Sequence, residues 1–199
     1  AFAVRGAEVR LTTLVNFLFT LGFSGVEGTI TFLAAERLGY GPPQNVRIFL
    51  FLGIILILTQ GVLARRLAPR VGERILALCG LSLGFCAFAV LSTVHSTIPA
   101  FIGFTLLGVG SGLINPSLAA LASIYSADVD QGRNLGSFRA AGSFARAIGP
   151  LLADFSYWKF GSRNAYLMGA TMMVLPLIFS TKLPRPIAKP IESVAVPPS

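Results

Sequence analysis

Long apolar stretches constrain this sequence more than any other feature. A helix that spans a bilayer needs about 20 mostly apolar residues. Six stretches meet that length, at 11–36, 46–64, 74–94, 98–125, 134–158 and 164–181. Short connectors rich in turn residues separate them, such as GYGPP at 39–43 and KFGS at 159–162. We therefore expect an all-α membrane protein with a bundle of six transmembrane helices over 11–183.

Composition excludes an ordinary soluble domain. Hydrophobic residues make up 54% of the chain and charged residues only 12%, about half the charge of a typical soluble domain. A net charge of +8 could indicate a nucleic-acid partner. The basic residues, however, cluster in short loops between apolar stretches, where they set the orientation of a membrane protein. We therefore expect membrane lipid, and not nucleic acid, around this chain.

The distribution of basic residues predicts the orientation. Ten lie on one side of the expected membrane: Arg5, Arg10, Arg65, Arg66, Arg70, Arg74, Arg133, Lys182, Arg185 and Lys189. Four lie on the other side: Arg37, Arg47, Lys159 and Arg163. Because basic residues concentrate on the cytoplasmic side, we expect both termini to be cytoplasmic.

The two ends of the sequence differ from the apolar region. The chain starts at Ala1 without a methionine or a cleavable signal, so it looks like a piece of something longer. Residues 1–10 are expected to be the end of a cytoplasmic linker. Residues 184–199 are rich in proline and are expected to form a disordered cytoplasmic tail.

The first apolar stretch carries a polar stripe. Steps of three or four residues place one set on a single helical face: Thr13, Asn16, Thr20, Ser24, Glu27 and Thr31. The stripe spans about 27 Å at 1.5 Å per residue, close to the hydrocarbon thickness. These side chains either hydrogen-bond a neighbouring helix or line a solute pathway, and the sequence leaves both interpretations open.

The fifth stretch places ionisable residues at membrane depth. Arg139, Gly142, Arg146, Gly149 and Pro150 share one face by helical spacing. Buried ionisable groups are costly in a membrane and usually face a bundle interior or a water-filled cavity. Asp154, placed to neutralise at most one of the arginines, could pair with Arg146 or with Lys159. Gln60 and Asn115, in the second and fourth stretches, are expected to face the same cavity.

Other polar and small residues have simpler interpretations. Cys79 and Cys86 are expected to be buried packing residues, and His95 an interfacial loop residue. The pairs Gly80/Gly84 and Gly108/Gly112 match the small-xxx-small pattern of closely packed membrane helices. Because no set of nucleophile, base and metal ligands is present, we expect no enzyme, no metal and no cofactor.

Three motifs in this sequence resemble the major facilitator superfamily of transporters. GVLARR at 61–66 is similar to the family's cytoplasmic loop motif, although Arg65 replaces the usual acidic residue. GVGSGLINP at 108–116 resembles the fourth-helix pattern of drug antiporters. The segment from Gly142 to Pro150 resembles the antiporter glycine–proline motif. Residues 131–151 are similar to the tetracycline transporter-like branch.

The resemblance implies the C-terminal six-helix half of a twelve-helix transporter that works by alternating access. Its partners would be the N-terminal half of the same transporter and a small organic, anionic or drug-like solute. The resemblance is also compatible with coupling of transport to protons. Expected substrate-binding residues are Arg139, Arg146, Glu27, Asn16, Thr20, Gln60 and Asn115. Expected conformational residues are Gly61, Arg65, Arg66, Gly142, Gly149 and Pro150. The plasma membrane is expected ahead of an organelle or nuclear membrane. The alternative is a non-transporting membrane assembly or receptor-like protein that kept the fold.

Overall fold

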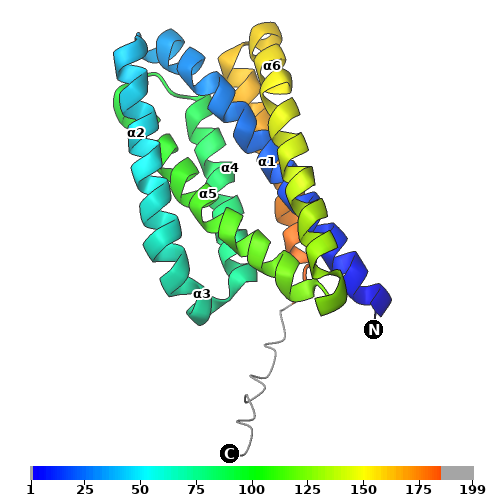
Figure 1. Cartoon of the computed structure of the whole chain (residues 1–199). Helices are drawn as coiled ribbons and strands as arrows, with labels where there is room; N and C mark the ends of the chain where they lie inside the picture. Colours follow the sequence, from blue (N-terminus) through cyan, green and yellow to red (C-terminus); the bar gives the residue numbers. More distant parts are fainter. Residues whose placement is uncertain (1, 185–199) are drawn as a thin grey trace, which may run out of the picture.

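The protein is a helical bundle in the computed structural model, which describes residues 2–184 apart from the side chains of residues 2–5 and 128 (Figure 1). Within this range the elements are helices and turns, without a strand. In chain order they are α1 (Phe2–Leu38), α2 (Pro42–Leu58), the π-helix η1 (Thr59–Ala64), α3 (Arg65–Val71), α4 (Glu73–Ser92), α5 (Thr97–Tyr125), the 3-10 helix η2 (Asp128–Asp130) and α6 (Gln131–Thr181). Five helical stretches are long and apolar enough to cross a membrane. The expected all-α membrane fold is confirmed.

The last element, α6, contains both of the final two apolar stretches. Gly161 interrupts it with φ 80° and ψ 165°, a backbone conformation that L side chains rarely adopt. The chain folds back at this point, so that 131–160 and 162–181 form the two arms of a hairpin (yellow and orange in Figure 1). Gly161 lies in the connector expected at 159–162, while the count of six spans stays a prediction.

Helix boundaries differ from expectation at both ends of the bundle. Residues 2–10, expected to be linker, are already part of α1. The start of α2 lies at Pro42, four residues before the expected stretch, because proline suits the first turn of a helix. The side chain of Gln44 accepts a hydrogen bond from the backbone N–H of Gly41 at 3.1 Å. The tail expected at 184–199 lies, except for its first residue, outside the described residues.

The segment GVLARR at 61–66 is helical, whereas a loop motif was expected there. From the end of α2 the backbone continues through the π-helix η1 into α3 without leaving the helical region, and the turn comes only at Gly72, with φ 82°. A π-helical turn accommodates one extra residue inside an α-helix. Arg65 and Arg66 therefore lie on a continuous helical rod, at the end of the bundle where residue 2 also lies (Figure 1).

Glycines bring α5 close to two neighbouring helices. A Cβ added at Gly80 of α4 would lie 2.7 Å from the carbonyl oxygen of Gly110, so these backbones are in contact. On the α2 side, a Cβ at Gly108 would lie 2.7 Å from Ile55, and one at Gly112 would lie 2.7 Å from Thr59. The predicted close approach at Gly80, Gly108 and Gly112 is confirmed.

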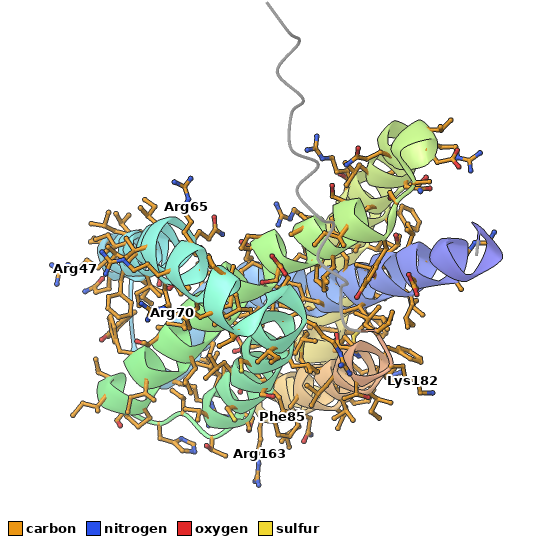
Figure 2. All side chains as sticks on the ribbon, turned by 90° about the horizontal axis from the view of Figure 1, so that it is seen from below. Arg47, Arg65, Arg70, Phe85, Arg163 and Lys182 are labelled. Atoms are coloured by element: carbon orange, nitrogen blue, oxygen red, sulfur yellow. The ribbon has the colours of Figure 1, made fainter. Side chains whose placement is uncertain are left out.

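Many large apolar side chains lie on the outer surface of the bundle, among them Ile57, Phe144 and Leu151. Figure 2 views the bundle from the end that carries α3, with Phe85 of α4 on the outside and Arg65 and Lys182 at opposite edges. Cys79 and Cys86 are unpaired and exposed on α4, so the prediction that they are buried is wrong. Helical spacing placed the two cysteines on one face but could not tell which face packs against the bundle.

Candidate solute pathway

The polar stripe of α1 packs against the first arm of α6. The Asn16 side chain is buried and donates a hydrogen bond from Nδ2 to the carbonyl oxygen of Phe138 at 3.3 Å. Ser24 is buried too, and its hydroxyl lies 3.5 Å from the carbonyl oxygen of Ala145. Thr20 is buried between these two positions. These contacts agree with the interhelical interpretation of the stripe, and solute binding by Asn16 and Thr20 stays a prediction.

Glycines allow this close approach. A Cβ at Gly149 would overlap with Oγ of Ser24 and lie 2.5 Å from the carbonyl oxygen of Leu21. A Cβ at Gly142 would lie 3.0 Å from Nδ2 of Asn16. Two of the three glycines in the expected conformational set, Gly142 and Gly149, therefore lie at the contact between α1 and α6.

The following turn continues the same contact. A Cβ at Gly28 would lie 3.3 Å from the Cβ of Pro150 and 3.4 Å from Oδ1 of Asp154. Pro150 removes one backbone donor from α6, and it does so where the helix packs on a glycine of α1. The Asp154 carboxylate thus lies beside α1, although its residue remains exposed.

Both candidate arginines of α6 are exposed. Arg139 and Arg146 are seven residues apart, about 10 Å along the axis. Within the described residues, neither forms an ion pair within 4.0 Å. The expected pairing of Asp154 with Arg146 is therefore not seen. Arg146 instead interacts electrostatically with the carboxylate of Glu27 on α1.

Glu27 borders a small hollow between three helices. The hollow has a volume of about 130 Å³, and apolar residues of α1, α2 and α5 surround Glu27 there, including Phe23, Leu52 and Leu107. Glu27 itself is exposed. The structure thus brings Glu27 near Arg146 and places the acid on the side of α1 that faces α2.

The other expected site residues are more distant from this pair. Asn115, half-buried in α5, lies seven residues beyond Gly108, which borders the hollow, so it is about 10 Å further along the helix. Gln60 is exposed in η1. Gly61, Arg65 and Arg66 are exposed beyond it at the α3 end of the bundle. No ion pair within 4.0 Å joins these residues to Glu27 or Arg146 among the described side chains.

A polar network at the Gly161 end of the bundle was not among the sites predicted from the sequence. The Glu36 carboxylate at the end of α1 accepts hydrogen bonds from the hydroxyls of Tyr157 and Ser162, the latter at 2.8 Å. Arg37 donates to the Ser162 hydroxyl at 2.8 Å and lies 3.3 Å from Nδ1 of His95. These contacts hold α1 to both arms of α6. The sequence signal was present, since Glu36 and Arg37 are adjacent charges at a helix end.

The described side chains include no cluster of three potential metal ligands. What they do offer is a pair of exposed guanidinium groups with an acid nearby, on helices in close glycine-mediated contact. Guanidinium groups bind carboxylates and phosphates through two parallel hydrogen bonds.

Comparison with known proteins gives one consistent family. The pattern of the Major Facilitator Superfamily matches residues 12–197. The chain is 30% identical to Major facilitator superfamily domain-containing protein 10 from Mus musculus over 180 residues, covering 90% of this chain and 39% of that protein. It thus spans about 40% of the length of this relative.

Solved structures agree in fold. The crystal structure of the human organic anion transporter MFSD10 (TETRAN) superposes with a TM-score of 0.83 at 29% identity, covering 87% of this chain and 41% of that one. A POT family transporter crystallised with 5-aminolevulinic acid superposes with a TM-score of 0.80 at 18% identity, covering 87% of this chain and 37% of that one. At that identity the second likeness concerns the fold alone.

Proposed function

This chain belongs to the Major Facilitator Superfamily, and on that premise we propose that it forms the C-terminal half of a secondary transporter for organic anions. The observation that carries the proposal is the pair of exposed arginines, Arg139 and Arg146, on α6, which is long and apolar enough to cross a membrane. A relative with a TM-score of 0.83 is described as an organic anion transporter, which supports the same solute class.

The physical argument rests on the cost of a bare charge in a membrane. A guanidinium at this depth needs water, a carboxylate or a bound anion to offset its desolvation. Within the described residues neither arginine has an ion-pair partner within 4.0 Å. The rigid, planar guanidinium also fits a carboxylate, sulfonate or phosphate better than an ammonium group does.

The proposed mechanism is alternating access between two six-helix halves, with α6 crossing the membrane twice. Alternating access requires two bundles that rock about a shared site near the midplane, so the N-terminal half of the transporter would supply the other wall. Gly142, Gly149 and Pro150 would set the spacing of α1 and α6, while Gly61, Arg65 and Arg66 would act at the cytoplasmic end. Glu27 would carry the coupled proton, since it borders the hollow between α1, α2 and α5 and its charge interacts with that of Arg146.

These assignments lead to a proposed orientation of the bundle in the membrane. The α3 end of the bundle, with Arg65, Arg66 and Arg70, would face the cytoplasm together with both termini. The Gly161 end would face outward from a plasma membrane, or into the lumen from an organelle or nuclear membrane.

The test is substitution of each arginine by lysine in the full-length transporter. Arg139→Lys and Arg146→Lys keep the charge but remove the two-point contact. At least one of them should raise the KM for an anionic solute by about 10-fold, equivalent to about 1.4 kcal/mol. Transport of a neutral solute of similar size should change little. Arg133→Lys is the matched control, because Arg133 lies on the same helix but pairs with Asp130 at 3.4 Å.

Equal losses for the anionic and the neutral solute would contradict the proposal, since the arginines would then serve only to hold helices together. The alternative of a receptor-like protein that kept the fold expects both arginines to be neutralised by carboxylates. The absence of such ion pairs within the described residues favours transport over that alternative.

A further inference from the structure

A second cavity, with no arginine among its lining residues, lies between α1 and the two arms of α6. Its volume is about 510 Å³, within the range of about 300–1,000 Å³ typical of ligand sites. Its walls include Leu152 and Ser156 from the first arm and Met168 and Leu175 from the second. The arms meet at Gly161 and diverge below it (Figure 1). We call this cavity the α6 groove.

The α6 groove is suited to a hydrocarbon. None of its lining residues is charged. Its principal buried polar groups are the hydroxyls of Thr29 and Tyr166, which lie 3.2 Å apart and hydrogen-bond each other, while Thr29 also contacts the carbonyl oxygen of Gly25 at 3.1 Å. Because these groups are already satisfied within the protein, an occupant needs no polar atoms at this depth.

The length of the α6 groove matches one leaflet of a bilayer. Its lining residues on the second arm run from Ala165 to Leu175, a rise of about 15 Å at 1.5 Å per residue. The hydrocarbon core of a bilayer is about 30 Å thick, so one leaflet contributes about half of that. A linear chain that enters at the Gly161 end would therefore reach the bilayer midplane at the far end of the groove.

Charged and aromatic residues mark the Gly161 end as the headgroup level. Lys159 and Arg163 flank Gly161 and are both exposed, and Arg163 projects away from the bundle in Figure 2. Neither forms an ion pair within 4.0 Å among the described residues. Trp158 is 83% exposed beside them, and tryptophan concentrates at membrane–water interfaces. A phosphate is the complementary partner for such a basic pair.

We propose that the α6 groove binds one acyl chain of a membrane phospholipid, taken from the leaflet at the Gly161 end, with the lipid phosphate beside Lys159 and Arg163. The lipid fills the space between the diverging arms of α6 and covers the adjoining surface of α1. Binding of this lipid does not depend on the transported solute. The lipid proposal therefore stands whether or not the anion proposal is correct.

The test is photo-crosslinking in the full-length transporter. The protein is reconstituted in nanodiscs of phosphatidylcholine whose acyl chain carries a mid-chain diazirine, and labelled peptides are mapped by mass spectrometry. Label is expected on 152–156 and 168–175 well above the level on the outer surface of α4. Ser156→Trp fills the α6 groove and should lower groove labelling to the α4 level.

Ser82→Trp is the matched control. Ser82 lies exposed on α4, outside the groove, and donates to the carbonyl oxygen of Leu78 four residues earlier, as Ser156 does to that of Leu152. It should leave groove labelling unchanged. If Ser156→Trp prevents folding, Ala165→Leu narrows the same groove with a smaller side chain and should produce the same loss.

Three results would overturn the proposal. Groove labelling equal to that of the α4 surface would mean bulk lipid contact alone. Unchanged labelling in a folded groove-filling variant would place the lipid elsewhere. Labelling by a photoactivatable sterol in place of the phospholipid would assign the groove to a different lipid class.

Discussion

Replacement of Gly149 by alanine tests the contact between α1 and α6 directly. The added Cβ would lie 2.5 Å from the carbonyl oxygen of Leu21, and real Cβ contacts essentially never fall below 3.0 Å. The Ser24 hydroxyl can rotate away from the new methyl group, but a backbone carbonyl cannot. The two helices must therefore separate by about 0.5 Å or more along this contact.

The magnitude follows from three contributions. Overpacking of this kind costs about 1–3 kcal/mol, and loss of the interhelical hydrogen bond of Ser24 adds about 0.6 kcal/mol. The lower conformational entropy of the unfolded chain after replacement of glycine by alanine offsets about 0.4–1 kcal/mol of this loss in stability. The net expectation is a loss of about 0.6–3.2 kcal/mol, or a fall in Tm of about 1–13 °C at about 2–4 °C per kcal/mol.

The assay is thermal unfolding of the full-length transporter in detergent, followed by circular dichroism. Gly136→Ala is the control, because Gly136 is on the same helix and a Cβ there meets nothing within 4 Å. That variant should be neutral or slightly stabilised. The double variant Ser24→Ala/Gly149→Ala should recover only part of the loss, since the clash with Leu21 remains. If the Gly149→Ala protein has the same Tm as the Gly136→Ala protein, the close contact is refuted.

Three further predictions concern topology and transport. Single cysteines at Arg70 and Ser96, in a background without Cys79 and Cys86, should label from opposite sides of the membrane; labelling from one side would overturn the span assignment. Glu27→Gln cannot exchange a proton, so the pH dependence of uptake should flatten in the full-length transporter, and an unchanged pH profile would leave Glu27 a packing residue. Residues 1–199 reconstituted alone should show no saturable flux, because alternating access needs a second bundle; robust flux from a demonstrated monomer would contradict that requirement.

Hydropathy predicted the fold of this chain well because bilayer thickness sets helix length. The apolar stretches correspond to helices, and the glycine pairs that were expected to pack closely do so at Gly80 and Gly108. Helix ends were predicted less well. The start of α1 and the helical path through Arg65 depend on backbone hydrogen bonds that continue past the apolar region, and hydropathy carries no information about them.

The candidate site was only partly predictable, because periodicity defines a face but not its partner. The polar residues of α1 do share one helical face, as predicted. Asn16 and Ser24 on that face, however, contact carbonyl oxygens of α6. The same limit explains Cys79, whose face was identified but whose exposure was not. The position of Glu27 relative to Arg146 depends on how α1 crosses α6. Glycines such as Gly25 determine this crossing, because a Cβ added there would lie 2.8 Å from the Cβ of Ala153.

The π-helical turn η1 has a consequence for how relatives of this chain should be aligned. A π-helical turn absorbs one extra residue and leaves the helix after it facing almost the same way, so loss of one residue between Thr59 and Ala64 would restore regular α-helical pairing while Arg65 and Arg66 kept their direction. A relative with one residue fewer in this turn therefore aligns with a one-residue gap before its GVLARR segment. A relative with the same number of residues but a regular α-helix here would turn by about 100° more, so it could match every letter of the segment and still present its charges in another direction.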